Sequence, residues 1–352
     1  MRAQRKLGRV NEDDPITRQM GVDRQASQAE TGSLASSTFS SLDEMQRWVF
    51  RRILNEGAPA SPRDLPTLEL PPIQLVLTNP RRRVLTSVSR KWRLPLAVGE
   101  FCWHLSASNE LSFIRYYSDR WSEFADDEQT IRGSCYGYRL FRDAEDSPSQ
   151  WETAHKLLRQ DPSSRRAVLL MSQPLMDRDI TAKDVACATS LQFLLRNGQL
   201  DAVLHMRSND AFWGLPYDVF LFTMLQELFA AELNVELGRY YHSIGSLHLY
   251  QKHVRTAKTV LDDSNWGDFE MPRLSNPEAL PQFLSAERAL RLGDPGAPRL
   301  LETLPQYWRQ LAEILGYYRF GQQSFDSKNS ILHSPYNAVL ACLGGGKVLA
   351  LR

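Results

Sequence analysis

Cys187 is the residue of this sequence whose neighbours point most clearly to chemistry. Polar side chains of complementary type follow it in the order Arg207, Ser208, Asp210, Asp218, His248 and Tyr250. A cysteine thiolate is a strong nucleophile, and a nearby guanidinium lowers the pKa of the thiol. Guanidinium and hydroxyl groups also bind phosphate oxygens. The array therefore indicates covalent catalysis on a phosphorylated substrate.

The residues from Cys187 to Tyr250 resemble the thymidylate synthase family without a gap. Upstream, Arg165-Arg166 resembles the paired-arginine phosphate loop of that family, and Glu100 and Tyr136-Gly137 stand at the places of its glutamate and its Tyr-Gly turn. The resemblance covers roughly residues 42–275 and is strongest in the middle. It implies an α+β fold in which helices surround a bent mixed sheet, and it implies 5,10-methylenetetrahydrofolate as the cofactor.

The resemblance also implies the catalytic roles. Cys187 would add to C6 of a pyrimidine and make C5 a carbon nucleophile, with Arg207 favouring the thiolate. Glu100 and Tyr136 would move protons as general acids and bases. A lone glutamate in an apolar segment is costly to bury, which favours a functional role for Glu100. The residues expected to contact the folate are Trp121, Asp210 and Gly214.

The nucleotide, a pyrimidine monophosphate, is expected to contact most of the remaining polar residues. The residues expected to form this site are Arg165, Arg166, Arg207 and Ser208 for the phosphate, Asp210 and Asp218 for the base, His248 and Tyr250 for the sugar, and Gln192. In the resembled family the arginine pair reaches into the site of the partner subunit. The resemblance therefore implies a homodimer with arginines donated across its interface.

Asp218 departs from the resemblance, because the uracil-specific enzymes carry an asparagine at this place. An asparagine amide satisfies both N3–H and O4 of uracil. An ionised carboxylate facing O4 would oppose two acceptors, at a cost of roughly 1–3 kcal/mol. Cytosine offers an amino donor at N4 and an acceptor at N3 that can share the carboxyl proton. The sequence therefore predicts folate-dependent C5 hydroxymethylation of CMP or dCMP.

Other departures keep two alternatives open. The family's histidine, proline, glutamine and aspartate are replaced by Ala188, Ala186, Met206 and Ser246, and residues 344–352 are not its short apolar ending. One alternative is a C5 methyltransferase acting on dUMP or on a cytosine nucleotide. The other is a non-catalytic paralogue that binds nucleotide or RNA. The pair Cys187 and Arg207 disfavours the second alternative, and Asp218 disfavours the uracil form of the first.

Composition sets the outer bounds of the interpretation. The 352 residues are 42% hydrophobic and 24% charged, with a net charge of +1, which gives no electrostatic reason to expect binding to nucleic acid or membranes. The cysteines Cys102, Cys135, Cys187 and Cys342 lack paired spacing, which predicts neither a metal site nor a disulfide framework. We expect a cytoplasmic enzyme, because no apolar run has the length of a membrane span and the N-terminal residues lack the apolar core of a secretory signal.

The elements that must position these residues can be read from periodicity. Residues 1–40 are too polar to fold and are predicted to be a disordered tail, followed by a catalytic domain over 41–275 and a helical extension over 276–352 packed on it. A capping box at Ser41–Glu44 predicts a helix that ends near Gly57. Prolines between 59 and 72 predict an extended loop. Strands are predicted at 73–78, 167–171, 189–195, 202–206 and 240–250, and helices at 94–105, 219–233 and 299–320.

Overall fold

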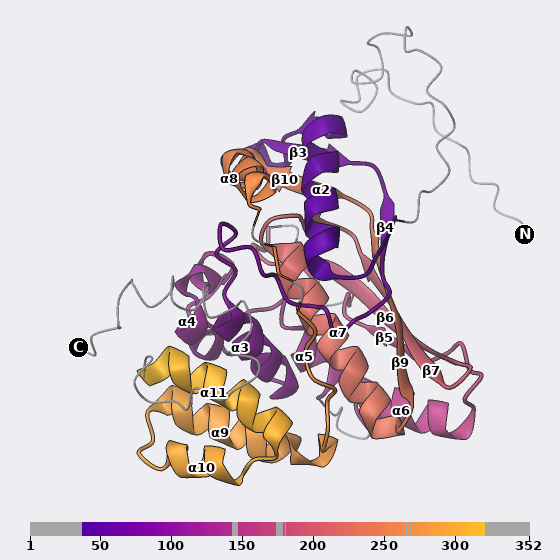
Figure 1. Ribbon diagram of the computed structural model, residues 1–352, viewed down its shortest axis with the longest axis vertical. Helices are drawn as coiled ribbons and strands as arrows, with labels where there is room; N and C mark the ends of the chain where they lie inside the picture. Colours follow the sequence, from indigo (N-terminus) through magenta and orange to yellow (C-terminus); the bar gives the residue numbers. More distant parts are fainter. Residues whose placement is uncertain are drawn as a thin grey trace, which may run out of the picture. The chain divides into compact units, whose positions relative to one another are not determined.

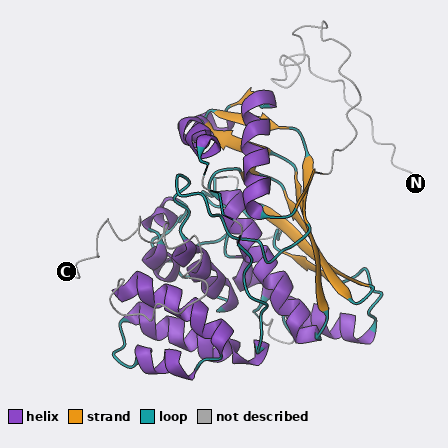
Figure 2. Ribbon diagram, viewed as in Figure 1, coloured by secondary structure: helices purple, strands orange, loops and turns teal. Residues whose placement is uncertain are grey.

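The larger of two sheets in the described part of the chain is mixed and has six strands (Figures 1 and 2). The computed structural model describes residues 37–142, 147–173, 179, 181–264, 266–267 and 269–320. In spatial order the strands are β1 (Ser37–Phe39), β4 (Ile73–Leu77), β9 (Glu236–Ile244), β7 (Gln199–Met206), β6 (Ala188–Arg196) and β5 (Val168–Leu170). Strand β7 runs parallel to β9 and antiparallel to β6, with a register shift in each pair. The predicted α+β class with a mixed sheet is therefore confirmed.

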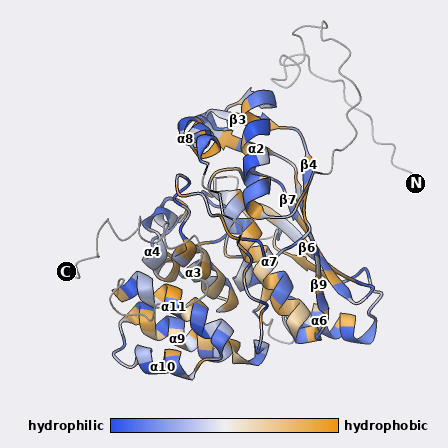
Figure 3. Cartoon of the chain, viewed as in Figure 1, coloured by the Kyte–Doolittle hydropathy of each residue, from blue (hydrophilic) through white to orange (hydrophobic). Residues whose placement is uncertain are grey.

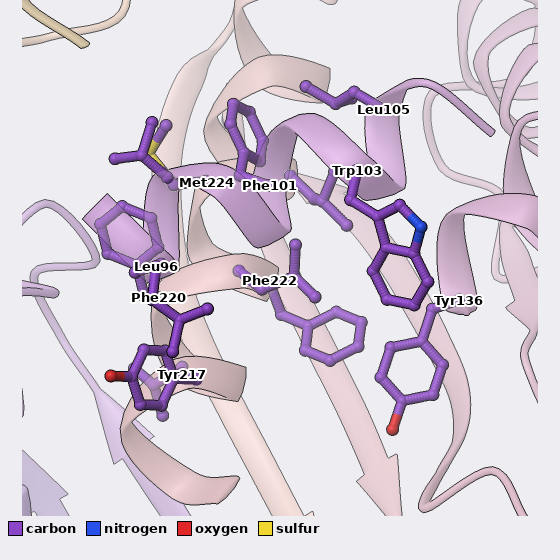
Figure 4. Close-up of a cluster of buried hydrophobic side chains, with 14 of the residues drawn as sticks. Leu96, Phe101, Trp103, Leu105, Tyr136, Tyr217, Phe220, Phe222 and Met224 are labelled. Carbon is purple, nitrogen blue, oxygen red and sulfur yellow. The ribbon is translucent and has the colours of Figure 1, made fainter. Parts of the chain in front are cut away.

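Helix α7 (Gly214–Leu233) covers one face of this sheet and is buried along most of its length. It is apolar on nearly every side, as its largely orange ribbon in Figure 3 shows, so the predicted central helix is confirmed and begins earlier than expected. Helix α3 (Leu94–Leu105) packs against it. Figure 4 shows Phe101 and Trp103 of α3 together with Phe220 and Phe222 of α7 in this core.

A second, four-stranded sheet was not predicted. Its strands in spatial order are β2 (Ala58–Ala60), β3 (Thr67–Leu70), β10 (Leu247–Tyr250) and β8 (Asn209–Asp210). Two predictions are corrected here. The proline-rich stretch contains strands because Pro59 lies in β2, the edge strand of this sheet, and the other prolines lie outside the strands. The predicted strand 240–250 is two strands in different sheets, broken at Gly245 and Ser246, where the chain turns from β9 to β10.

Helix α2 (Leu42–Glu56) confirms the predicted capping signal in part. Ser41 accepts the backbone N–H of Glu44 at 3.2 Å, as a capping residue should, whereas the Glu44 carboxylate accepts the N–H of Ser40 at 2.8 Å. The described chain begins earlier than the predicted start of order. Strand β1 pairs with β4, and Phe39 is buried against Trp48. The rest of the predicted tail lies outside the described residues.

The helical C-terminal part differs from the prediction in its breaks. Between residues 276 and 320 the structure has three α-helices, namely α9 (Leu280–Leu292), α10 (Ala297–Thr303) and α11 (Gln306–Phe320). The predicted helix 299–320 is therefore two, because Pro305 interrupts it, and α9 was missed. Helix α11 packs on α9 and on α3, and Tyr117 donates to the buried Glu287 at 2.7 Å. The boundary at 275 remains a prediction, and residues 321–352 lie outside the described chain.

The remaining helices frame the site. They are α4 (Leu111–Tyr117), α5 (Tyr136–Leu140), α6 (Gln150–Gln160) and α8 (Gln251–Asp262), with short 3-10 turns η1 (Pro62–Asp64), η2 (Asp119–Glu123) and η3 (Pro277–Ala279). Helices α2 and α8 lie beside the four-stranded sheet at the top of Figure 1. No helix in the described part of the chain is long and apolar enough to cross a membrane.

Candidate active site

Cys187 lies immediately before β6, where the pairing of β6 with β7 sets it beside Arg207. The Arg207 backbone N–H donates to the Cys187 carbonyl at 2.9 Å. The Arg207 guanidinium donates to the carbonyls of Ala186 and Val185, each at 2.9 Å. The predicted cation therefore does two things: it holds the backbone that carries the thiol, and it places a positive charge near the sulfur.

Burial dominates the acidity of the thiol. It raises the pKa of Cys187 to about 11, against the lowering effect of Arg207 and of Arg63, with Asp218 and Asp184 raising it further. The prediction that a nearby cation lowers the pKa holds for the direction of the Arg207 effect, but not for the net result. Without substrate, Cys187 is a thiol at neutral pH, so its proton must leave when the nucleotide is attacked.

Arg63 is a site residue that the sequence reasoning missed. It lies in η1, its charge lowers the pKa of both Cys187 and Tyr250, and its φ of 53° is in the left-handed region. The next residue, Asp64, has a φ of 58°. Two successive non-glycine residues with positive φ are uncommon and mark a constrained loop. The sequence signal is the Pro-Arg-Asp turn between β2 and β3, which lies in the stretch predicted only as an extended loop.

Asp218 lies on the first turns of α7 and receives one neutral hydrogen bond. The Asn209 amide donates to its Oδ2 at 2.7 Å. Burial raises the pKa of Asp218 to about 7, Asn209 lowers it, and the charge of Asp210 raises it. The hydrogen bond has room only because residue 214 is glycine, since a Cβ there would lie 2.7 Å from the Asn209 amide nitrogen.

Glu100 and Tyr136 share this electrostatic environment. Burial raises the pKa of Glu100 to about 8, and the Asp218 charge raises it further, although a hydrogen bond with Trp121 opposes both. Burial also raises the pKa of Tyr136, with contributions from Asp218 and Cys187. The Tyr136 hydroxyl accepts the N–H of Ala188 at 3.3 Å. The charge of Asp218 therefore affects the pKa values of Glu100, Tyr136 and Cys187.

The Tyr-Gly turn is held by its packing on α3. His104 stacks on Tyr136 with ring centroids 5.6 Å apart and accepts the backbone N–H of Gly137 at 3.1 Å. A Cβ at Gly137 would lie 1.9 Å from the His104 carbonyl oxygen, so only glycine permits this approach. Figure 4 shows the Tyr136 hydroxyl directed away from the apolar cluster.

The short pairing of β8 with β10 brings together the residues predicted for base and sugar. His248 pairs with Asp210, and its Nδ1 lies 3.5 Å from the Ser208 hydroxyl. The Tyr250 ring packs edge-on against His248 at 5.2 Å. Asp210 accepts the backbone N–H groups of Phe212 and Trp213 at 2.9 and 3.1 Å. This carboxylate thus orders the turn into α7.

Arg165, Arg166 and Gln192 have no described contact with Cys187. Both arginines are exposed in the loop before β5, and Gln192 donates to the Arg165 carbonyl at 2.8 Å. Gln192 is five residues along β6 from Cys187, which is roughly 16 Å at the rise of a strand. The contacts of the described residues thus place neither arginine beside Cys187, and the phosphate site remains a prediction.

A cavity of about 610 Å³ lies between α4 and α11, with Arg93, Arg115, Tyr116 and Tyr318 among its lining residues. This cavity is near Glu100, because the charge of Arg93, one of its lining residues, lowers the pKa of Glu100. Aromatic rings continue around Glu100: Trp121 packs on Trp103 at 5.3 Å, and Trp213 stacks on Tyr217 at 6.3 Å with the Arg120 guanidinium 4.7 Å from the Trp213 ring. Among the described residues, no cluster of His, Cys, Asp and Glu has the arrangement of a metal site.

The part of the chain that is similar to known proteins includes the site residues described above. The family model described as thymidylate synthase matches residues 48–282. The chain is 31% identical over 225 residues to the deoxyuridylate hydroxymethyltransferase of Bacillus phage SP01, a match that covers 60% of this chain and 58% of the phage protein. It is 27% identical over 229 residues to the thymidylate synthase of Bacillus phage phi3T and 27% identical over 231 residues to thymidylate synthase 1 of Bacillus subtilis strain 168, each match covering 64% of this chain and 78% of the relative.

Proposed function

Because this chain belongs to the thymidylate synthase family, we propose that it hydroxymethylates C5 of a cytosine nucleotide monophosphate, CMP or dCMP. The observation that carries the proposal is Asp218, a carboxyl with a pKa raised to about 7, within electrostatic reach of Cys187, Glu100 and Tyr136. Such a group shares a proton with a base instead of repelling it.

Cys187 supplies the covalent step. Its Sγ bonds to C6 of the pyrimidine, the C5–C6 π electrons move onto C5, and C5 then bonds to the incoming one-carbon unit. Of the two predicted acid–base groups, Glu100 has a pKa of about 8, and its ionised form can take the thiol proton and, later, the C5 proton. Burial raises the pKa of Tyr136, so its phenol keeps its proton and acts as a donor. Loss of the C5 proton would go with cleavage of the bond between the transferred carbon and the folate nitrogen, so that tetrahydrofolate leaves and an exocyclic methylene remains at C5. Water would then add to this methylene as the thiolate leaves C6, which regenerates the C5–C6 double bond.

Asp218 acts on the base side of this step. A neutral carboxyl donates its proton to N3 of cytosine and accepts a hydrogen bond from the N4 amino group. This donation withdraws electrons from C6 and makes it a better acceptor for the thiolate. An ionised carboxylate would repel uracil O4, whereas a carboxyl with a pKa of about 7 is largely protonated at slightly acidic pH.

The aromatic and basic residues around Glu100 fit 5,10-methylenetetrahydrofolate, which would supply the one-carbon unit. Trp121 and Trp213, both partly buried, have flat ring surfaces suited to a flat heterocycle. The neighbouring cavity is lined by Arg93 and Arg115, whose charges suit the carboxylates of a glutamate tail, and also by Asp119 and Glu128. Asp119 lies 4.0 Å from the Arg115 guanidinium. Glu100 can hold or release a proton near neutral pH beside these rings.

The proposal includes a homodimer in which Arg165 and Arg166 complete the partner's phosphate site. Both arginines are exposed in the single chain, and Val168 and Leu170 of the adjacent edge strand are 40% and 53% exposed. Exposed aliphatic side chains beside unpaired arginine heads suit a buried contact with a second copy. A mixed dimer of Arg166→Ala and Cys187→Ser subunits should regain about one working site. A chain that stays monomeric by light scattering at micromolar concentration contradicts the dimer.

A second candidate is hydroxymethylation of dUMP, favoured by the name of the SP01 relative. A protonated carboxyl can also pair with uracil, donating to O4 and accepting from N3–H. The two candidates therefore differ in which oxygen of Asp218 carries the proton.

Tritium release from C5-labelled CMP, dCMP, UMP and dUMP, run in parallel with the folate, tests the proposal. The proposal expects the fastest release from a cytosine nucleotide, no release by Cys187→Ser, and no dihydrofolate absorbance, because hydroxymethyl transfer leaves the folate unoxidised. Dihydrofolate formation would instead identify a methyltransferase. Faster release from dUMP would favour the second candidate, and no release from any nucleotide would contradict catalysis.

A further inference from the structure

A chain of three buried polar side chains ends on Asp218. The Tyr240 hydroxyl lies 2.8 Å from Nδ1 of His242, and Nε2 of His242 lies 3.1 Å from Oδ1 of Asn209. The Asn209 amide nitrogen then donates to Oδ2 of Asp218 at 2.7 Å. Tyr240 and His242 are fully buried and Asn209 is 3% exposed. No part of this relay depends on solvent.

The relay has a fixed direction. Burial lowers the pKa of His242 to about 3 and raises that of Tyr240, so the imidazole is neutral and the phenol keeps its proton. A neutral imidazole has one donor and one acceptor nitrogen. With the phenol donating to Nδ1, the proton is on Nε2 and is donated to the Asn209 carbonyl. The Asn209 amide must then donate to Asp218. The direction follows from the Asp218 end, where the Asn209 amide nitrogen donates to Oδ2 and leaves the Asn209 carbonyl to accept from Nε2 of His242.

From this geometry we infer that Asn209, held by His242 and Tyr240, is a positioning residue that gives Asp218 a fixed polarity and thereby selects cytosine over uracil. Oδ2 is kept as an acceptor, so the carboxyl proton resides on Oδ1. A carboxyl of free polarity would match either base, because exchanging the two oxygens converts the cytosine pattern into the uracil pattern. The inference rests on the proposed function, since it assigns Oδ1–H to N3 and Oδ2 to the N4 amino group.

The room for this relay is built into the fold. Asn209 lies in β8 and His242 in β9, two strands of different sheets, and the Asn209 backbone N–H donates to Ser246 at 2.8 Å where the chain leaves β9. Gly214 leaves the space that a Cβ would take from the Asn209 amide. The relay thus uses the break between β9 and β10 that the sequence did not predict.

Several other titratable groups interact with Asp218 and also contribute to the pH dependence of binding. Asp210 of β8 raises the pKa of Asp218, while Glu100 of α3, Tyr136 of α5, Cys187 and Tyr240 each respond to its charge. Asn209 donates a hydrogen bond that favours the ionised form. Removing Asn209 should therefore move the titration of Asp218 to higher pH, and none of the other groups is removed with it.

The test is the affinity of the full-length protein for dCMP, CMP, dUMP and UMP by calorimetry, without folate, at pH values on both sides of 7. For wild type we expect tighter binding of the cytosine nucleotides, weakening as pH rises past the pKa of Asp218. For Asn209→Ala we expect the preference for cytosine to fall about tenfold and the weakening to begin about one pH unit higher. Tyr240→Phe, which removes one oxygen atom from the relay, should shift both quantities in the same direction by less.

Gln226→Ala is the matched control. Gln226 is fully buried on the same helix as Asp218 and donates to backbone carbonyls of Leu200 and Arg239, outside the relay. It should change stability but neither quantity. If Asn209→Ala and Tyr240→Phe keep the wild-type preference and pH dependence, the inference is overturned while the cytosine assignment stands. A wild type that prefers uracil nucleotides contradicts the cytosine assignment, and loss of that preference in Asn209→Ala would still support the fixed polarity.

Discussion

Helix α7 carries two buried carboxylates that the protein treats in opposite ways. Glu227 accepts from the Arg81 guanidinium at 2.6 Å, from Arg83, and from the backbone N–H of Leu274 at 3.0 Å. Although burial alone raises the pKa of Glu227, the two arginines and these hydrogen bonds lower it. Asp218, near the start of the same helix, has one neutral donor and a pKa raised to about 7.

We interpret Glu227 as a carboxylate that stabilises the fold and Asp218 as one that takes part in the reaction. Two cations fix the charge of Glu227, which ties the loop before α3 and the segment before α9 to the central helix. Asp218 has no described ion pair, so its charge depends on what binds beside it. Perturbation toward neutral pH without a charge partner is typical of a group that handles protons. The predictions below separate the two ends of the helix.

The largest expected effect on turnover comes from Cys187, which lies near the Asp218 end of α7 in the site. Cys187→Ser should reduce turnover by about a thousandfold or more, because a hydroxyl does not replace the thiolate in the attack on C6. Nucleotide affinity and thermal stability should stay near wild type, since the phosphate and base contacts lie elsewhere. The measurement is tritium release beside calorimetric binding. A variant that keeps more than a few per cent of wild-type activity would contradict the covalent mechanism.

For Glu227 we expect the opposite, a large loss of stability with little change in activity. Glu227→Gln leaves Arg81 and the fully buried Arg83 without their counter-charge, and should lower the free energy of unfolding by about 3–5 kcal/mol. Activity per folded molecule should change little. Urea unfolding measures the loss, and Asp218→Asn, on the same helix, is the matched control. Equal destabilisation by the two substitutions would erase the proposed distinction.

The pH dependence of stability should also differ in sign. Asp218 has a pKa of 3.8 before burial and of about 7 in the fold. Between these values the unfolded chain has released a proton that the folded protein retains, so the free energy of unfolding falls as pH rises. Asp218→Asn should remove up to about 4 kcal/mol of this decline. Glu100, with a pKa of about 8, leaves part of the decline in place.

Glu227 provides the internal contrast for that measurement. Its pKa is lowered in the fold, so its contribution is present above its ordinary value of 4.5 and is lost as pH falls through the lower, folded value. Glu227→Gln should therefore change the acid side of the stability curve. A decline above pH 4 that is unchanged in Asp218→Asn would show that Asp218 titrates near its ordinary pKa.

The sequence predicted best where neighbours in the chain are also neighbours in space. Cys187 and Arg207 meet because adjacent strands pair, and α7 is recognisable because it is apolar on nearly every side. Asn209 and His242 meet only through the break between β9 and β10, whose one local signal, Gly245, does not say that the two strands enter different sheets. Arg63 belongs to the site through a strained turn among prolines. The net acidity of Cys187 was misjudged because burial outweighs a single nearby cation.

The substrate preference of Asp218→Asn tests the central claim most directly. The account predicts that wild type has the higher kcat/KM on a cytosine nucleotide and that the asparagine variant prefers a uracil nucleotide, with a change of about ten- to a hundredfold in the ratio, because a mismatched base leaves buried polar groups unpaired. The four nucleotides should be compared with both proteins under one condition. A wild type that already prefers dUMP, with a ratio unchanged in Asp218→Asn, would contradict the claim that Asp218 reads the base.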